Sequence, residues 1–103
     1  VLVKAVELGG GQIAGLVLRR TGLTLGQERV QGGTVVVVQK VAPRSAAAGA
    51  GIMAGDLVLE VNSREIATVA DFNKAALAAR RTGQLVLLFR RGYAAERIAF
   101  DFE

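Results

Sequence analysis

The sequence predicts one β-rich α+β domain, in which short strands surround one short and one long helix. Val- and Leu-rich runs recur along the chain, and such runs favour strands. Strands do not alternate with long crossover helices, which argues against a doubly wound parallel sheet. The 103 residues, of which 51% are hydrophobic, are enough for one domain with its own core and too few for two.

The first part of the chain contains candidate strands separated by glycines. Residues 1–8 and 13–20 are apolar runs, and we interpret both as strands or edge segments within an N-terminal strand or linker segment, residues 1–20. Residues 28–33 are interpreted as a polar loop. Residues 34–41, TVVVVQKV, are the clearest strand, because four consecutive valines suit a surface buried on both faces and are poor in a helix interior.

A short helix and a strand are predicted in the middle of the chain. Residues 45–51, SAAAGAG, can form one or two helical turns that end at Gly49 or Gly51, since glycine supplies the left-handed conformation that closes a helix. Residues 56–62, DLVLEVN, alternate as a half-buried strand does. The residues expected to share one face of this strand are Leu57, Leu59 and Val61.

The long helix is predicted to run from Thr68 to about Arg81 and to stop at Gly83. Thr68 as the N-cap, with Asp71 three positions later, resembles a capping box. The last two strands, joined by GYAA as a hairpin, are residues 84–91 and 96–103.

The composition excludes several kinds of site. The chain has no histidine and no cysteine, so it can build neither a Ser-His-Asp triad nor a histidine or thiolate metal site. The glycine clusters do not have the spacing of a phosphate-binding loop. We therefore expect no metal, no cofactor and no catalytic residues in this chain.

Charge and hydropathy limit the partners that can be expected. The formal charge is +4, but six of the ten arginines lie in separate pairs at residues 19–20, 80–81 and 90–91, and only four Phe and one Tyr are present. A nucleic-acid surface usually concentrates charge and adds stacking aromatics, so we expect no nucleic-acid partner. No apolar run approaches the ~20 residues needed to span a bilayer, so direct membrane insertion is not expected. The chain begins at Val1, and we interpret it as a piece of a longer protein.

The segment SAAAGAGIMAGDLVLEVNSREI, residues 45–66, resembles the core pattern of bacterial PDZ domains, Ser-Pro-Ala-x-x-Ala-Gly-Leu-x-x-Gly-Asp-x-Ile-x-x-Val-Asn-Gly. Two residues depart from this pattern, because Ala46 replaces Pro and Ser63 replaces Gly. The resemblance covers residues 21–103 and assigns them to a PDZ domain. The matching residues are Ser45, Ala47, Ala50, Gly51, Ile52, Gly55, Asp56, Val58, Val61 and Asn62. Within this pattern, a carboxylate directly after a glycine suits a turn, so we interpret Asp56 as a turn residue and not as a catalyst.

The resemblance implies a partly open antiparallel β-barrel or sandwich of five to six strands, capped by one short and one long helix. It also implies that an extended peptide, usually a C-terminus, is added as a strand to a sheet edge. In the family, a Gly-Φ-Gly-Φ loop (Φ is an apolar residue) holds the terminal carboxylate with its backbone amides. The best match is Gly22, Leu23, Thr24 and Leu25, with Thr24 in place of the second glycine. A second candidate loop, residues 14–18, stays open as an alternative.

The resemblance also implies that the long helix forms the other wall of the groove. Phe72, Ala76 and Ala79 are predicted to face it, because their spacing of four and three places them on one helix face. Phe72 stands where some PDZ domains have a histidine that selects Ser or Thr two residues before the peptide terminus. We therefore expect an apolar preference at that peptide position.

The chain is most similar to the second, C-terminal PDZ module of HtrA/Deg-type envelope serine proteases. That resemblance implies a trimer-based parent with a catalytic domain upstream, a periplasmic or cell-envelope location, and a role in protein quality control. The expected partners are peptide or unfolded-protein C-termini and other domains of the parent. The only serines are Ser45 and Ser63, and neither has a base beside it in the sequence. The alternative is a PDZ interaction module of a non-protease scaffold, a secretion-system protein or a membrane-embedded protease.

Overall fold

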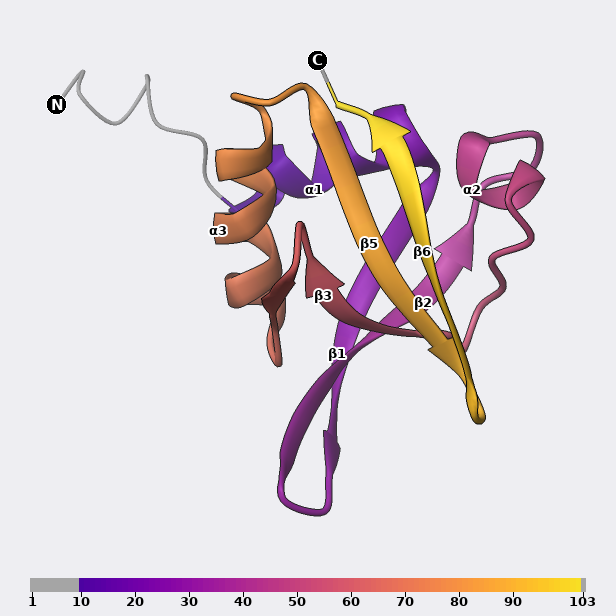
Figure 1. Cartoon of the computed structure of the whole chain (residues 1–103), viewed down its shortest axis with the longest axis vertical. Helices are drawn as coiled ribbons and strands as arrows, with labels where there is room; N and C mark the ends of the chain where they lie inside the picture. Colours follow the sequence, from indigo (N-terminus) through magenta and orange to yellow (C-terminus); the bar gives the residue numbers. More distant parts are fainter. Residues whose placement is uncertain (1–9, 103) are drawn as a thin grey trace, which may run out of the picture.

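Six antiparallel strands form one open sheet in the computed structural model, which describes residues 10–102 (Figure 1). The predicted α+β class and strand number are therefore confirmed. The sheet order is β1-β2-β3-β5-β6, and β4 pairs with β3. The strands are β1 (Leu23–Val30), β2 (Gly33–Val41), β3 (Leu57–Val61), β4 (Arg64–Glu65), β5 (Gln84–Arg91) and β6 (Ala94–Asp101). The helices are α1 (Gly10–Thr21), α2 (Ala46–Gly49) and α3 (Val69–Ala79).

The segment predicted as an N-terminal strand is a helix instead. Ile13, Leu16 and Val17 are buried in α1, and their spacing of three and one places them on one helical face. The strand prediction for residues 13–20 is therefore wrong, because the apolar run has helical and not alternating periodicity. The buried face of α1 joins the same hydrophobic core as the sheet. The strand predicted for residues 1–8 lies outside the described residues.

The β1–β2 hairpin is longer than the sequence suggested, and it projects beyond the rest of the domain (Figure 1). Residues 28–30, predicted as part of a polar loop, belong to β1, and the turn comprises only Gln31 and Gly32. Polar residues are tolerated in this strand because both faces of the projecting hairpin meet solvent. The Val-rich β2 is buried as predicted. Its three consecutive buried residues, Val36, Val37 and Val38, cover both faces of the sheet.

The regular alternation predicted for β3 is interrupted. Val58 and Val61 are both buried although they are three residues apart. The pairing between β3 and β5 shifts by one residue between Val58 and Glu60, as a β-bulge requires. Because of the bulge, Leu57 and Leu59 are only partly buried, and the prediction that both share the buried face of Val61 is wrong.

Side chains cap the N-termini of α2 and α3, and the cap at Thr68 was predicted. The Ser45 hydroxyl accepts a hydrogen bond from the Ala48 amide at the start of α2 (3.1 Å). At the start of α3 the Thr68 hydroxyl accepts from the Asp71 amide (3.0 Å), and the Asp71 carboxylate accepts in return from the Ala67 amide (3.1 Å). This is the reciprocal arrangement of a capping box, except that the return hydrogen bond comes from Ala67, one residue before the N-cap. Of the helices described, none is long and apolar enough to cross a bilayer.

The C-terminal hairpin is confirmed with a tighter turn than predicted. Strands β5 and β6 are joined by Gly92 and Tyr93 alone, and Gly92 has φ 61°. Leu85, Leu87 and Phe89 alternate into the core from β5. Phe89 meets Phe100 of β6 edge to face, with ring centres 6.5 Å apart.

The turn between β3 and β4 contains two residues in the left-handed region. Asn62 has φ 49° and Ser63 has φ 70°. The Asn62 side chain also binds β5, because its Oδ1 accepts from the Val86 amide (2.6 Å) and its Nδ2 donates to the Gln84 carbonyl (3.2 Å). Asn62 is therefore explained both by its backbone conformation and by its side-chain bonds, whereas Ser63 bears a conformation that favours glycine.

Replacing Ser63 by glycine is expected to stabilise the domain by about 1 kcal/mol, because an L-residue pays roughly that cost in the left-handed region. Urea denaturation of the wild type and of Ser63→Gly measures the difference. Ser63→Ala is the matched control, since it removes the hydroxyl but keeps the Cβ atom. Equal unfolding midpoints for the glycine and alanine variants would contradict this explanation.

Candidate functional site

One edge of the sheet is open beside a helix. Among the described residues, β1 pairs with β2 alone, so its other edge has no strand partner. Helix α3 packs against β1, and the Gln27 side-chain oxygen accepts a hydrogen bond from the Val69 amide at the first turn of α3 (2.8 Å). An unpaired strand edge exposes amide and carbonyl groups that can bind another extended chain.

A small apolar cavity of about 200 Å³ lies where α1, β1 and α3 meet. Each of the three elements contributes at least three residues to its wall. Only Thr24 and Asn73 among them have polar side chains. The lining residues are Ala14, Gly15, Val17, Leu18, Leu23, Thr24, Leu25, Val69, Phe72 and Asn73.

The structure brings together four of the seven residues predicted for the site. Leu23, Thr24 and Leu25 line the cavity from β1, and Phe72 lines it from α3. Gly22 adjoins it at the start of the strand. Their contact with a ligand stays a prediction.

The other two predicted residues, Ala76 and Ala79, are 0% and 2% exposed and do not line the cavity. They belong to the core face of α3. Val69 and Asn73, four residues apart, line the cavity in their place. Apolar spacing alone selects the core face of a helix, and this explains why the sequence analysis missed Val69 and Asn73. The only sequence signal for this second face of α3 was a polar residue, Asn73, one helical turn after an apolar residue, Val69.

The alternative loop at residues 14–18 is excluded by the helix α1. These residues lie inside an α-helix, whose backbone amides are committed to helical hydrogen bonds, so they cannot form a loop of free amides. Gly15 and Leu18 nevertheless line the cavity as part of the α1 surface. Leu18 is 45% exposed, and the sequence analysis did not single it out for that role.

Gly22 sets the position of α1 relative to β1. It has φ 88°, its amide donates to the Leu18 carbonyl (2.8 Å), and its carbonyl accepts from the Ala42 amide (2.8 Å). A Cβ atom at this position would overlap the Ser45 side chain. Since Ser45 is the N-cap of α2, this one glycine lets the end of α1, the start of β1 and the start of α2 pack together.

Gly22→Ala is expected to destabilise the domain by about 3 kcal/mol or more, because it combines a left-handed backbone with steric overlap. Gly32→Ala is the matched control. Gly32 has φ 90° but open space around its Cα, so only the backbone cost of about 1 kcal/mol applies. Thermal unfolding of both variants measures the difference, and equal losses would show that the contact with Ser45 is unimportant.

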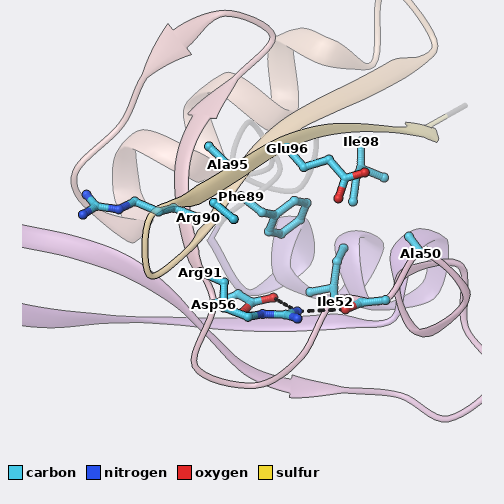
Figure 2. Close-up of a pocket in the computed structure, with 11 residues that line it drawn as sticks. Ala50, Ile52, Asp56, Phe89, Arg90, Arg91, Ala95, Glu96 and Ile98 are labelled. Atoms are coloured by element: carbon cyan, nitrogen blue, oxygen red, sulfur yellow. Dashed lines mark hydrogen bonds and ion pairs between the residues drawn. The ribbon is translucent and has the colours of Figure 1, made fainter.

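A second cavity, of about 440 Å³, lies between the loop that follows α2 and the β5–β6 hairpin (Figure 2). Asp56 is at its base and 4% exposed. As predicted, Asp56 forms a turn, since its Oδ2 accepts from the Met53 amide (3.0 Å). The Arg91 guanidinium donates to both carboxylate oxygens (2.7 and 2.8 Å) and also to the Gly51 carbonyl (2.8 Å). Figure 2 shows Arg90 extending away from this pair.

These hydrogen bonds from Arg91 hold the pKa of Asp56 below its usual value, against the opposing effect of burial. Asp56 is therefore an ionised carboxylate held in an ion pair with Arg91. The sequence analysis did not foresee Arg91 as its partner, because the two residues are 35 positions apart.

Arg91→Ala is expected to lower the free energy of unfolding at pH 7. Because the pKa of Asp56 is lower in the folded than in the unfolded state, its stabilising contribution is present above about pH 4 and is lost as the pH falls through the lowered pKa. The difference between wild type and variant should therefore shrink below about pH 4. Arg90→Ala is the control, since Arg90 donates to the Gly92 carbonyl instead. A pH-independent difference would contradict this role of the ion pair.

Comparison with known proteins identifies the family. The model of the PDZ domain family matches residues 19–99. The chain belongs to the PDZ domain family. The family match begins within α1, two residues before the predicted domain start at residue 21.

Two relatives of this PDZ domain are named as probable proteases. It is 40% identical over 81 residues to a protein of Brucella suis biovar 1 (strain 1330) named "Probable periplasmic serine endoprotease DegP-like". A protein of the same name from Brucella abortus (strain 2308) matches equally. The match covers 79% of this chain and 15% of each relative, so the chain spans a small part of these proteins.

Two solved structures share the fold. The PDZ domain of EpsC from Vibrio cholerae has a TM-score of 0.64 at 13% identity, covering 82% of this chain and 98% of that one. The HtrA3 PDZ domain, solved with the phage-derived ligand FGRWV, has a TM-score of 0.58 at 27% identity, covering 80% of each chain. The predicted PDZ fold and its likeness to HtrA/Deg-type modules are thus confirmed.

Proposed function

We propose that this PDZ domain binds extended peptide segments by adding them as a strand to β1. The observation that carries the proposal is the open edge of β1 beside an apolar cavity. Backbone hydrogen bonds to the strand edge would supply affinity, and the cavity would accept one apolar side chain of the ligand. The peptide-bound HtrA3 PDZ domain supports this reading of the fold.

Phe72 and Val69 favour an apolar ligand. The Phe72 ring is 1% exposed and closes the inner wall of the cavity, while Val69 lines the same wall one turn earlier. Neither side chain can form a hydrogen bond with Ser or Thr. The expected apolar preference two residues before a peptide terminus therefore stays part of the proposal.

For the whole protein we propose an HtrA/Deg-type serine endopeptidase of the bacterial cell envelope, in which this domain recognises substrate, regulates activity or takes part in assembly. The DegP-like relatives, which are named as probable periplasmic proteases, support this. Catalysis would then belong to another part of the parent protein. The alternative is an interaction module of a non-protease, because one fold can serve many functions and does not by itself choose between them.

Leu18→Glu tests whether the cavity between α1, β1 and α3 binds peptide. Leu18 lines the cavity yet is 45% exposed, so a charge there should weaken peptide binding by at least about tenfold without unfolding the domain. The matched control is Leu77→Glu, because Leu77 is also an exposed helical leucine (43%) but does not line the cavity. Binding is measured by titration with a library of C-terminal peptides that includes FGRWV.

Backbone amide shifts in the same titration locate the site. We expect them at residues 23–25 and 69–73. Shifts confined to the second cavity, around Ile52 and Ile98, or equal losses of affinity for both variants, would contradict the proposed site. If the wild type binds no member of the library, the proposed function fails.

A further inference from the structure

The amides at the start of β1 are already engaged within the protein. The Gly22 amide donates to the Leu18 carbonyl (2.8 Å), and the Leu23 amide donates to the Thr21 hydroxyl (3.1 Å). Residues 22–25 are those predicted to hold the terminal carboxylate of a peptide. Two of their four amides are therefore unavailable to a ligand in this conformation.

Thr21 is held in this arrangement from both sides. Its side chain is completely buried, and its hydroxyl donates a hydrogen bond to the Val17 carbonyl (2.7 Å). Because the hydroxyl proton points to Val17, the lone pairs of the oxygen are available to the Leu23 amide. A ligand carboxylate that took the Leu23 amide would remove one of the two hydrogen bonds of the buried hydroxyl and leave only its bond to the Val17 carbonyl, and this loss opposes binding.

The other contributions to binding do not need these amides. The open edge of β1 continues beyond Leu23 along the strand, and the cavity takes a side chain and not a main-chain terminus. An extended segment could therefore pair with β1 whether or not it ends at the cavity.

We propose that Thr21 is a specificity-determining residue, because its hydroxyl binds the Leu23 amide and keeps this amide from binding a ligand. The site between β1 and α3 then binds extended segments with little dependence on a free terminal carboxylate. This inference rests on the proposed peptide-binding function. It assigns the ligand class as extended apolar segments, with internal segments accepted as well as C-termini.

The test compares the same peptide library in two forms, with a free C-terminal acid and with a C-terminal amide. The wild-type domain is expected to bind both forms of a peptide within about threefold of each other. Thr21→Ala removes the hydroxyl and vacates the space that it occupies in front of the Leu23 amide, so that this amide is freed. In this variant the acid form should bind tighter by about tenfold, while the amide form stays unchanged, because a charge-assisted hydrogen bond becomes available. Thr21→Ser retains the hydroxyl and should behave as the wild type does.

A wild-type preference of about tenfold or more for the acid form would overturn the inference. So would a folded Thr21→Ala variant whose preference equals that of the wild type. The wild-type comparison can overturn the inference even if Thr21→Ala does not fold, since it needs no variant. Failure of both peptide forms to bind the wild type would instead reject the proposed function, which keeps the two failures distinct.

Discussion

The site depends on one steric constraint, the close contact between Gly22 and Ser45. The chain must leave α1 and enter β1 within a single residue, and only a residue without a Cβ atom fits against the cap of α2. The left-handed backbone of Gly22 then directs β1 along the sheet while α1 stays beside it. The apolar cavity exists because these two elements, with α3, are held at that distance.

The glycine-rich signature, residues 50–63, supports the fold at a distance from this cavity. Asp56 binds Arg91 across the sheet, and Asn62 binds the backbone of β5. Both interactions join β3 and its flanking loops to the C-terminal hairpin. Asp56 and Asn62 are thus engaged in structural bonds, and the cavity between α1, β1 and α3 is formed by residues outside the signature.

Much of the fold could be predicted from local patterns. The Val-rich β2, the cap of α3 and the C-terminal hairpin depend on residues close together in the chain, where propensity and hydrogen-bond chemistry act directly. The errors have equally local causes. The run from Ile13 to Leu18 was interpreted as a strand although its buried residues have helical spacing, and a bulge in β3 broke an alternation that looked regular.

The candidate site was only half predictable. Sequence pattern and family resemblance together selected Leu23, Thr24, Leu25 and Phe72. These residues follow two local signals, since the strand begins after Gly22 and the helix begins after its cap at Thr68. They could not select Leu18, Val69 and Asn73, nor exclude Ala76 and Ala79. Which face of α3 meets β1, and which meets the core, depends on how helices and sheet pack together. Likewise the state of the Leu23 amide depends on a hydroxyl whose direction is set by the end of α1. The sequence by itself determined the elements and their family, whereas tertiary packing decided which side chains and amides remain available to a ligand.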